Sequence, residues 1–328
     1  MNFDQLFANF KDTRVLIVGD VMLDTYWWGN VDRISPEAPV PVVALHHKEY
    51  RVGGAANVAL NTAALGAQTS IISVIGNDQD GQQLLQLMES HGINTSFMIA
   101  AEERITTNKM RIMGRNQQMM RLDAEMDADI SENLQTKILE KVAAFIQQHT
   151  PTILIFEDYN KGVLTEKLIT AIIQLCHQFQ IITAVDPKKK NFLTYRGVTL
   201  FKPNLKEVKE GLNIQLSDTD LAQMKTIHEL LKAQLEHSIS FITLSEKGVF
   251  YQQEDTASII PTHIRNIADV SGAGDTVIAV ASLVFATTQQ MHLAAEMANI
   301  AGGLVCEEVG TVAINPNRLL DECKMLLS

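Results

Sequence analysis

Short runs of β-branched and other apolar residues alternate with helix-like segments along most of the chain, and this alternation limits the possible folds more than any other feature. The run at 14–20, RVLIVGD, ends in Gly-Asp, as is typical of a strand buried on both faces. Similar apolar runs follow at 153–156, 181–185, 199–201 and 241–244. Helical patterns lie at 164–179, 221–235, 272–286 and 292–306. The sequence therefore predicts an α/β fold with a Rossmann-like, doubly wound, mainly parallel sheet that binds ligands beyond the carboxyl ends of its strands.

Two stretches with β-like patterns interrupt this alternation. Residues 26–50 alternate apolar and polar side chains between the first strand and a small-residue helix at 54–65, which favours an inserted β flap. The second insertion, 97–121, carries basic residues at alternate positions, so they share one face of a strand. We expect one domain, 1–328, in which the two insertions form a small β lid over a site.

Composition and charge exclude several classes of protein. The chain has 27 basic and 38 acidic residues, a net charge of −11, which argues against a nucleic-acid or anionic-membrane partner. Its three cysteines, Cys176, Cys306 and Cys323, are odd in number and lie in apolar stretches, so neither disulfides nor a zinc site is expected. Residues 1–10 lack a signal-peptide pattern, and no stretch approaches the roughly 18 uninterrupted apolar residues of a membrane span. We expect a cytoplasmic protein.

The segment DVSGAGDT at 269–276 is the strongest chemical signal in the chain. Gly272, Ala273 and Gly274 at the start of an apolar helix would expose backbone N–H groups that hold the oxygens of a transferring phosphoryl group. Asp275, beside that anion hole, would be the base that accepts the proton of an attacking hydroxyl. The same pattern also occurs as a packing device at helix starts, with the aspartate serving only as a first-turn charge.

A second small-residue segment, GGAAN at 53–57, begins the first predicted helix. Gly53 and Gly54 would permit close approach of a ligand, and the amide of Asn57 suits a sugar hydroxyl because it both donates and accepts hydrogen bonds. Taken alone, the segment could equally be an ordinary glycine-rich turn.

Together, GGAAN near the start and DxxGAGD near the end resemble the motifs of the ribokinase-like (PfkB) carbohydrate kinases, and the resemblance spans nearly the whole chain. Further matching segments follow in the same order: GDVMLD at 19–24, PNLKE at 203–207, TLSEKG at 243–248 and AN at 298–299. The resemblance implies an ATP- and Mg²⁺-dependent kinase with one Rossmann-like sheet and a β lid, and lids in this family often pair in homodimers.

The resemblance also assigns roles to individual residues. The base and the anion hole are again Asp275 and Gly272, Ala273 and Gly274. Positions matching the nucleotide and magnesium side, where Glu207 would hold Mg²⁺ through water, are Asn204, Glu207, Ser245, Gly248 and Asn299. Positions matching the sugar side are Asp20, Asp24, Gly53, Gly54 and Asn57. A K⁺ site seen in many members corresponds to Asp269 and Ser271.

Within the family, the segments at 14–43, 51–67, 110–125, 158–162 and 185–192 look like those of the D-glycero-β-D-manno-heptose 7-phosphate kinases. Those enzymes phosphorylate the anomeric O1 in the synthesis of ADP-heptose for lipopolysaccharide. In many bacteria the kinase is fused to a C-terminal nucleotidyltransferase domain, so the resemblance implies either a stand-alone kinase or the kinase half of such a protein. Glu157 departs from the resemblance, since Ser commonly precedes the DY pair.

A sugar phosphate also needs cations for its own phosphate, and an acidic protein must provide them locally. Candidate substrate-binding residues for this purpose, together with an aspartate of the DYNKG segment, are Lys109, Arg111, Arg115, Lys161, Lys188 and Asp158.

Three other functions are alternatives to a heptose 7-phosphate kinase. A kinase for another sugar or sugar phosphate, such as fructose 1-phosphate or a free hexose, is the nearest alternative. A non-catalytic phosphosugar-binding protein would need neither the base nor the magnesium residues. A dinucleotide-dependent oxidoreductase is disfavoured because no G-x-G-x-x-G follows the first strand.

Overall fold

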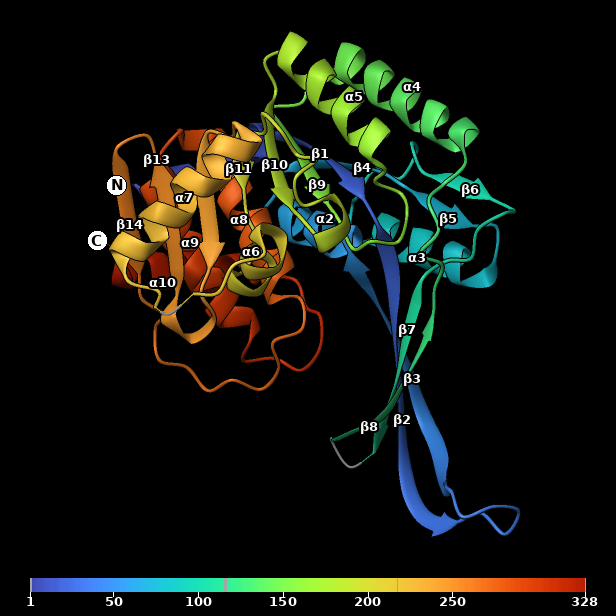
Figure 1. Ribbon diagram of the computed structural model, residues 1–328. Helices are drawn as coiled ribbons and strands as arrows, with labels where there is room; N and C mark the ends of the chain where they lie inside the picture. Colours follow the sequence, from blue (N-terminus) through green and yellow to red (C-terminus); the bar gives the residue numbers. More distant parts are fainter. Residues whose placement is uncertain (1, 115–116, 217, 328) are drawn as a thin grey trace.

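The computed structural model describes residues 2–114, 117–216 and 218–327 (Figure 1). Its main sheet has eight strands in the order β14-β13-β12-β11-β10-β9-β1-β4. Six of them run parallel: β4 (Gln68–Ile72), β1 (Arg14–Gly19), β9 (Ile153–Glu157), β10 (Ile182–Asp186), β11 (Leu200–Phe201) and β12 (Ile239–Thr243). The predicted α/β fold with a mainly parallel sheet is confirmed. An antiparallel hairpin of β13 (Val249–Gln253) and β14 (Thr256–Ile260), which the sequence patterns did not predict, completes one edge.

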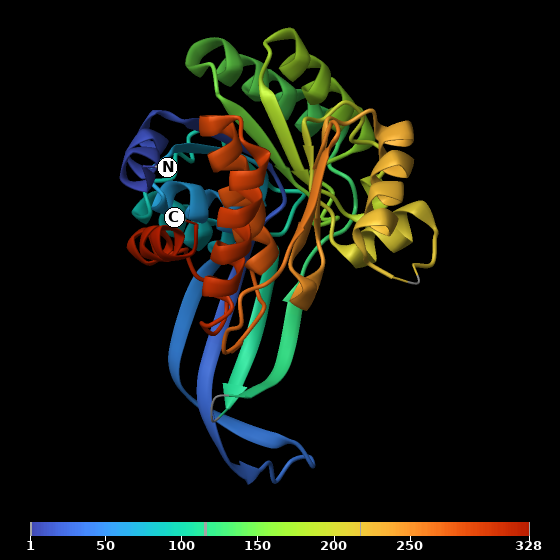
Figure 2. The same cartoon turned by 90° about the vertical axis from the view of Figure 1, so that its left-hand side faces the viewer.

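Helices cover both faces of this sheet, as Figure 2 shows with the orange and red α8 and α9 on one side and the yellow α7 on the other. The first face is covered by α1 (Phe3–Asn9), α2 (Ala55–Ala64), α3 (Gln79–Ser90), α8 (Ala273–Thr288), α9 (Met291–Val305) and α10 (Pro316–Leu326). The second is covered by α4 (Glu132–His149), α5 (Glu166–Gln178), α6 (Leu205–Leu212) and α7 (Leu221–Leu235). In β1, Val15 and Ile17 pack into the first core, whereas Leu16 and Val18 pack into the second. This strand is apolar throughout because both of its faces are buried.

None of the helices in the described ranges combines the length and the apolar character that crossing a membrane requires.

A second sheet of four strands extends away from the α/β body (Figure 1). It is formed by β3 (Pro41–Gly54), β2 (Val21–Ile34), β7 (Asn108–Gly114) and β8 (Gln117–Ala124), in that order. The two stretches that interrupt the alternation in the sequence therefore join into one sheet, which we call the flap. A separate small sheet pairs β5 (Val74–Gly76) with β6 (Ile99–Ala101).

The carboxyl ends of the parallel strands lie side by side and carry acidic residues. Gly19 at the end of β1 pairs with Glu157 of β9, and Glu157 pairs with Asp186 of β10. Asp20 follows directly after β1, where it is buried. The N-terminus of α8, with Asp275, lies at the same edge beside Glu157 and Asp186. The ligand site expected beyond the carboxyl ends of the strands is therefore between this edge and α8.

Candidate active site

Helix α8 begins at this edge, and two backbone N–H groups of its first turn have no partner among the described residues. Gly272, at the N-cap, has a φ of +77°, and a Cβ there would lie 2.7 Å from Nδ2 of Asn57. The N–H of Ala273 donates to Val270 O at 3.3 Å, but those of Gly274 and Asp275 have no partner within the described ranges. Free N–H groups at the positive end of a 16-residue helix form a site for an anion.

Asp275 lies in the first turn of this helix with its carboxylate held by two donors. Oδ2 accepts a hydrogen bond from Asn57 Nδ2 at 2.8 Å, and Oδ1 accepts one from the Tyr159 hydroxyl at 2.7 Å. Burial raises the pKa of Asp275 to about 6, while these two hydrogen bonds act in the opposite direction. At neutral pH the side chain is therefore an oriented carboxylate with a basicity suited to accepting a proton next to the anion site.

Tyr159 is a site residue for which sequence reasoning proposed no role. It lies in the loop after β9, and burial together with the charge of Asp275 raises its pKa well above the usual range, so it remains a hydrogen-bond donor. The ammonium groups of Lys109 and Lys188 lie 5.5 and 5.2 Å from its ring centroid. The DYNKG segment was noticed, but a phenol that reaches a residue 116 positions away has no local sequence signal.

Asp20 holds the Tyr159 loop instead of facing the solvent. Its carboxylate accepts hydrogen bonds from the backbone N–H groups of Tyr159, Lys161 and Val163, at 2.8, 3.0 and 3.0 Å. The carboxylate of Asp20, which was predicted to bind the sugar, is therefore already occupied by the backbone of this loop.

Asp158 is similarly engaged by the protein. Its carboxylate accepts hydrogen bonds from Asn191 Nδ2 at 3.0 Å, from the Tyr195 hydroxyl at 2.8 Å and from the backbone N–H of Asn160 at 2.8 Å. The side chain is buried, so these bonds fix the segment that follows β9. A structural role explains its position better than contact with substrate.

The two residues expected to organise magnesium form the start of α6. Asn204 and Glu207 make a reciprocal capping box, with the Asn204 N–H donating to Glu207 Oε2 at 2.7 Å and the Glu207 N–H donating to Asn204 Oδ1 at 2.8 Å. Lys188 donates to Glu207 Oε1 at 2.7 Å and to Asp186 Oδ1 at 3.0 Å. Carboxylate oxygens are preferred by Mg²⁺, and those of Asp186 and Glu207 retain lone pairs for its water ligands. This donor set fits Mg²⁺.

Lys188 was expected to contact the sugar phosphate, but here it joins these two carboxylates. Burial alone would lower the pKa of Lys188, whereas the charges of Asp186 and Glu207 raise it above the usual range. Lys202, which sequence reasoning missed, is buried and pairs with the other oxygen of Asp186 at 2.6 Å. Lys188 therefore remains charged, and the two lysines contact opposite oxygens of Asp186.

The flap brings the other predicted substrate residues to the same edge. Asp24 pairs with Arg111 at 2.7 Å and accepts a hydrogen bond from Thr311 Oγ1 at 3.2 Å. A Cβ on Gly53 would lie 2.9 Å from Oδ2 of Asp24, so only glycine fits there. Gly54 has a φ of +58°, a backbone conformation that residues with a side chain rarely adopt, which explains why glycine occupies this position. Arg111 is thus already paired with a carboxylate.

Among the remaining cations, only Lys109 is left unpaired within the described ranges. Lys161 pairs with Glu125 at 2.9 Å and with Asp127 at 2.7 Å. Burial lowers the pKa of Lys109, as expected for a cation without a carboxylate partner. Arg115 lies outside the described residues. Lys109 is therefore the cation best placed to meet an anionic group of a ligand.

The predicted nucleotide-side residues lie around the turn after β12. Gly248 has a φ of +95°, and a Cβ there would lie 1.9 Å from Ile260 O. Ser245 is exposed in the same turn, and Asn299 of α9 donates through Nδ2 to Pro261 O at 2.8 Å. The turn and α9 thus border the loop that leads to α8, and the role of these residues in nucleotide binding stays a prediction.

Asp269 and Ser271, predicted as a K⁺ site, lie in the loop before α8. Asp269 Oδ1 accepts hydrogen bonds from the N–H and hydroxyl of Ser271, at 3.0 and 2.9 Å, and Oδ2 accepts one from the Gly310 N–H at 2.9 Å. These bonds order the loop, and the K⁺ site stays a prediction.

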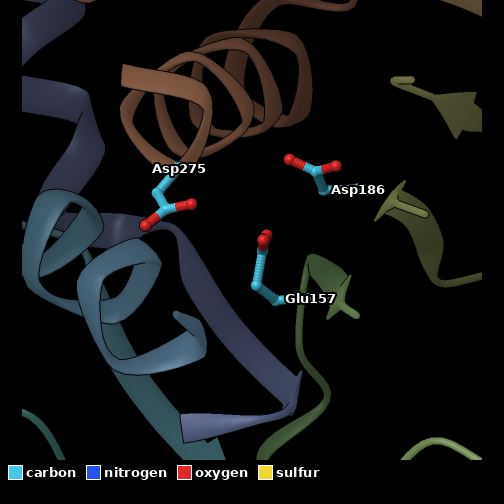
Figure 3. A group of neighbouring side chains, drawn as sticks. All are labelled: Glu157, Asp186 and Asp275. Atoms are coloured by element: carbon cyan, nitrogen blue, oxygen red, sulfur yellow. The ribbon is translucent and has the colours of Figure 1, made fainter. Parts of the chain in front are cut away.

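Figure 3 shows three carboxylates that meet beneath the start of α8. Glu157, Asp186 and Asp275 are all buried, and each offers an oxygen that lies within 4.8 Å of the others. Burial and the charges of Asp186 and Asp275 raise the pKa of Glu157 well above its usual range. Sequence reasoning identified Glu157 only as a departure from the resemblance.

A buried carboxylate beside free N–H groups at a helix N-terminus, at the carboxyl edge of a parallel sheet, is an arrangement suited to phosphoryl transfer. A family model described as "pfkB family carbohydrate kinase" matches residues 12–318. The chain therefore belongs to the PfkB family of carbohydrate kinases, and it is an enzyme of the phosphotransferase class.

Two curated relatives show how far the similarity extends. The chain is 42% identical over 308 residues to the bifunctional protein HldE of Methylobacillus flagellatus, covering 94% of this chain and 62% of the relative. It is 37% identical over 322 residues to the bifunctional protein HldE of Geobacter metallireducens, covering 97% of this chain and 64% of the relative. The chain thus spans less than two thirds of the length of these relatives.

Solved structures share the fold at low sequence identity. Phosphofructokinase-2 from Escherichia coli, in complex with potassium, has a TM-score of 0.81 at 17% identity, covering 96% of this chain and 99% of that one. Arabidopsis thaliana ribokinase, in complex with ribose and ATP, has a TM-score of 0.72 at 14% identity, covering 94% and 98%. Likenesses at such identities establish the ribokinase-like fold.

Replacing Asp275 by Asn tests its role as the base. The Asp275→Asn side chain keeps the shape of the carboxylate but cannot accept the hydroxyl proton, so kcat should fall about 10²–10⁴-fold. Steady-state ADP formation measures this loss, and circular dichroism checks the fold. The same change at the exposed Asp255, in the turn after β13, should leave kcat unchanged. Equal activity of the Asp275 variant would show that another group is the base.

The pH dependence of kcat/KM provides a second test. The pKa of Asp275 is raised to about 6, so the reactive carboxylate is present above this pH and is lost by protonation below it. We expect kcat/KM to fall by about tenfold per pH unit below the apparent pKa, which should be no higher than about 6. Measurement from pH 5 to 8, with a check that the protein stays folded, gives the profile. A flat acid limb would contradict the assignment.

Proposed function

We propose that this chain transfers the γ-phosphoryl group of ATP to the anomeric O1 of D-glycero-β-D-manno-heptose 7-phosphate, giving the 1,7-bisphosphate in ADP-heptose synthesis. The observation that carries the transfer reaction is the Asp275 carboxylate, which Asn57 and Tyr159 hold beside the free N–H groups of Gly274 and Asp275. The base and the anion site are adjacent, as attack by a hydroxyl on a phosphoryl group requires.

Each residue of the site has a separate role in the proposed transfer. Asp275 accepts the proton of the O1 hydroxyl while O1 forms a bond to the γ-phosphorus and the bond to the leaving ADP breaks. The N–H groups of Gly274 and Asp275 face the phosphoryl oxygens, whose charge they stabilise. Asp186 and Glu207 would hold Mg²⁺ through water, and the ion would supply charge neutralisation at the ATP phosphates. Tyr159 and Asn57 keep the base oriented.

A phosphorylated heptose as the acceptor is supported by two separate observations. The segments at 14–43, 51–67, 110–125, 158–162 and 185–192 look like those of heptose 7-phosphate kinases, and the similarity to the HldE proteins agrees with a role in heptose metabolism. Lys109, half-buried and without a carboxylate partner in the described chain, supplies a cation for the 7-phosphate.

The proposal includes a cytoplasmic homodimer joined through the flap. Apolar side chains on its strands are exposed in the single chain: Ile34, Leu45 and Met120 have 61%, 43% and 54% of their surface accessible. Such a surface on a protruding sheet is suited to contact with a second copy. A K⁺ ion at the loop of Asp269 and Ser271 is part of the same proposal.

A substrate panel combined with Lys109→Met tests the acceptor. The wild type should turn over heptose 7-phosphate faster than free heptose, fructose 6-phosphate, fructose 1-phosphate or ribose. Removing a charge-assisted contact with the 7-phosphate should raise KM for heptose 7-phosphate about 10- to 100-fold and leave KM for free heptose unchanged. ADP formation is the readout.

The exposed Lys225 of α7 offers a matched control, since Lys225→Met should change neither KM. Turnover of a different sugar alone would retain the kinase and refute heptose as the acceptor. ATP binding without turnover of any sugar would refute the kinase and favour a phosphosugar-binding protein.

A further inference from the structure

Glu157 is a buried acid without a partner. Its side chain is fully shielded from solvent, and neither Oε1 nor Oε2 has a hydrogen-bond partner in the described parts of the chain. In Figure 3 its carboxylate points from the end of β9 into the space flanked by Asp186 and Asp275. One oxygen of each residue lies within 4.8 Å of the others. An isolated buried carboxylate is strongly unfavourable, so this group requires a proton or a cation.

The charged forms of the groups around Glu157 do not balance. The local cluster holds four acids, Glu157, Asp186, Glu207 and Asp275, and two lysines, Lys188 and Lys202; with all six groups ionised, four negative charges against two positive charges leave −2. Both ammonium groups bind Asp186, and neither donates a hydrogen bond to Glu157. One divalent cation would cancel this charge.

A cation also fits the geometry better than a proton does. A protonated Glu157 would still have no hydrogen-bond acceptor within reach, so its hydroxyl would stay unsatisfied. Oxygen ligands on opposite sides of Mg²⁺ or Ca²⁺ lie about 4–5 Å apart, since each lies at about 2.0–2.6 Å from the ion. The three carboxylates match this spacing and offer only oxygen donors, which hard cations prefer.

We propose that Glu157, Asp186 and Asp275 bind one hard divalent cation, Mg²⁺ or Mn²⁺, in the protein without nucleotide. This site shares Asp186 with the water-mediated Mg²⁺ site near Glu207, but it adds Glu157 and Asp275 and needs no ATP phosphates. A carboxylate has about four lone-pair positions, and Asp275 uses two of them for Asn57 and Tyr159. One position can bind the cation while another accepts a substrate proton. The inference goes beyond the proposed function and does not depend on which sugar is phosphorylated.

Binding of Mn²⁺ to the nucleotide- and sugar-free protein tests this site. Electron paramagnetic resonance of free Mn²⁺ should show one bound ion per chain in the wild type. Glu157→Gln, which keeps the size of the side chain but removes its charge, should weaken binding at least about tenfold. The matched change Glu140→Gln, at an exposed position of α4, should leave binding unchanged.

Thermal unfolding provides a second readout and checks folding of the variants. Mn²⁺ should raise the midpoint of the wild type and of Glu140→Gln, because it binds only the folded chain, but should not raise that of Glu157→Gln. Mn²⁺ binding only in the presence of ATP, or equal binding by a folded Glu157→Gln protein, would overturn the proposal. Neither result bears on turnover with sugars, so failure here is distinguishable from failure of the proposed function.

Discussion

Asp20 fixes the position of the carboxylate of Asp275, the proposed base, from two directions. Its backbone carbonyl accepts the N–H of Ala55 at 3.0 Å, which places the start of α2 and therefore Asn57. Its side chain accepts three backbone N–H groups of the loop after β9, which places Tyr159. Asn57 and Tyr159 are the two donors to Asp275, so the orientation of the base depends on this one buried aspartate.

Electrostatics at this edge of the sheet follow from the parallel topology. Because parallel strands end at the same edge, polar residues that follow β1, β9 and β10 are brought together and buried under α8. Burial opposes the charged form of every acid there, and each acid with a fixed role has donors or ammonium groups that compensate: Asp20 by the backbone, Asp186 by Lys188 and Lys202. Glu157 alone among these described acids lacks such compensation, which is why its environment calls for a cation.

Patterns in the sequence were sufficient for the fold but only partly for the site. Apolar runs and helical periodicity located the parallel strands within a few residues, since those signals are local. They missed α4 and the hairpin of β13 and β14. The Gly-rich segment before Asp275 could be recognised because its residues are consecutive. The roles of Tyr159, Glu157 and Lys202 could not, because each depends on contacts between distant segments.

The predicted sugar ligands show the same limit in another form. A sequence reveals that a polar residue follows a strand, but not the direction of its side chain. Asp20 and Asp158 turn toward the backbone and buried donors, and Arg111 and Lys161 are already paired with acids. Among the predicted cations that the structure describes, Lys109 is therefore left for a phosphate. Only the three-dimensional structure shows which of these charged side chains a ligand can contact, because burial and ion pairing are not visible in the sequence.

The most direct measurement is a crystal structure with Mg²⁺, a non-hydrolysable ATP analogue and heptose 7-phosphate. We expect O1 of the sugar to lie within hydrogen-bond distance of Asp275, the γ-phosphate to contact the N–H groups at the start of α8, and the 7-phosphate to contact Lys109. A sugar bound with O1 remote from Asp275, or ATP phosphates bound away from α8, would contradict this expectation.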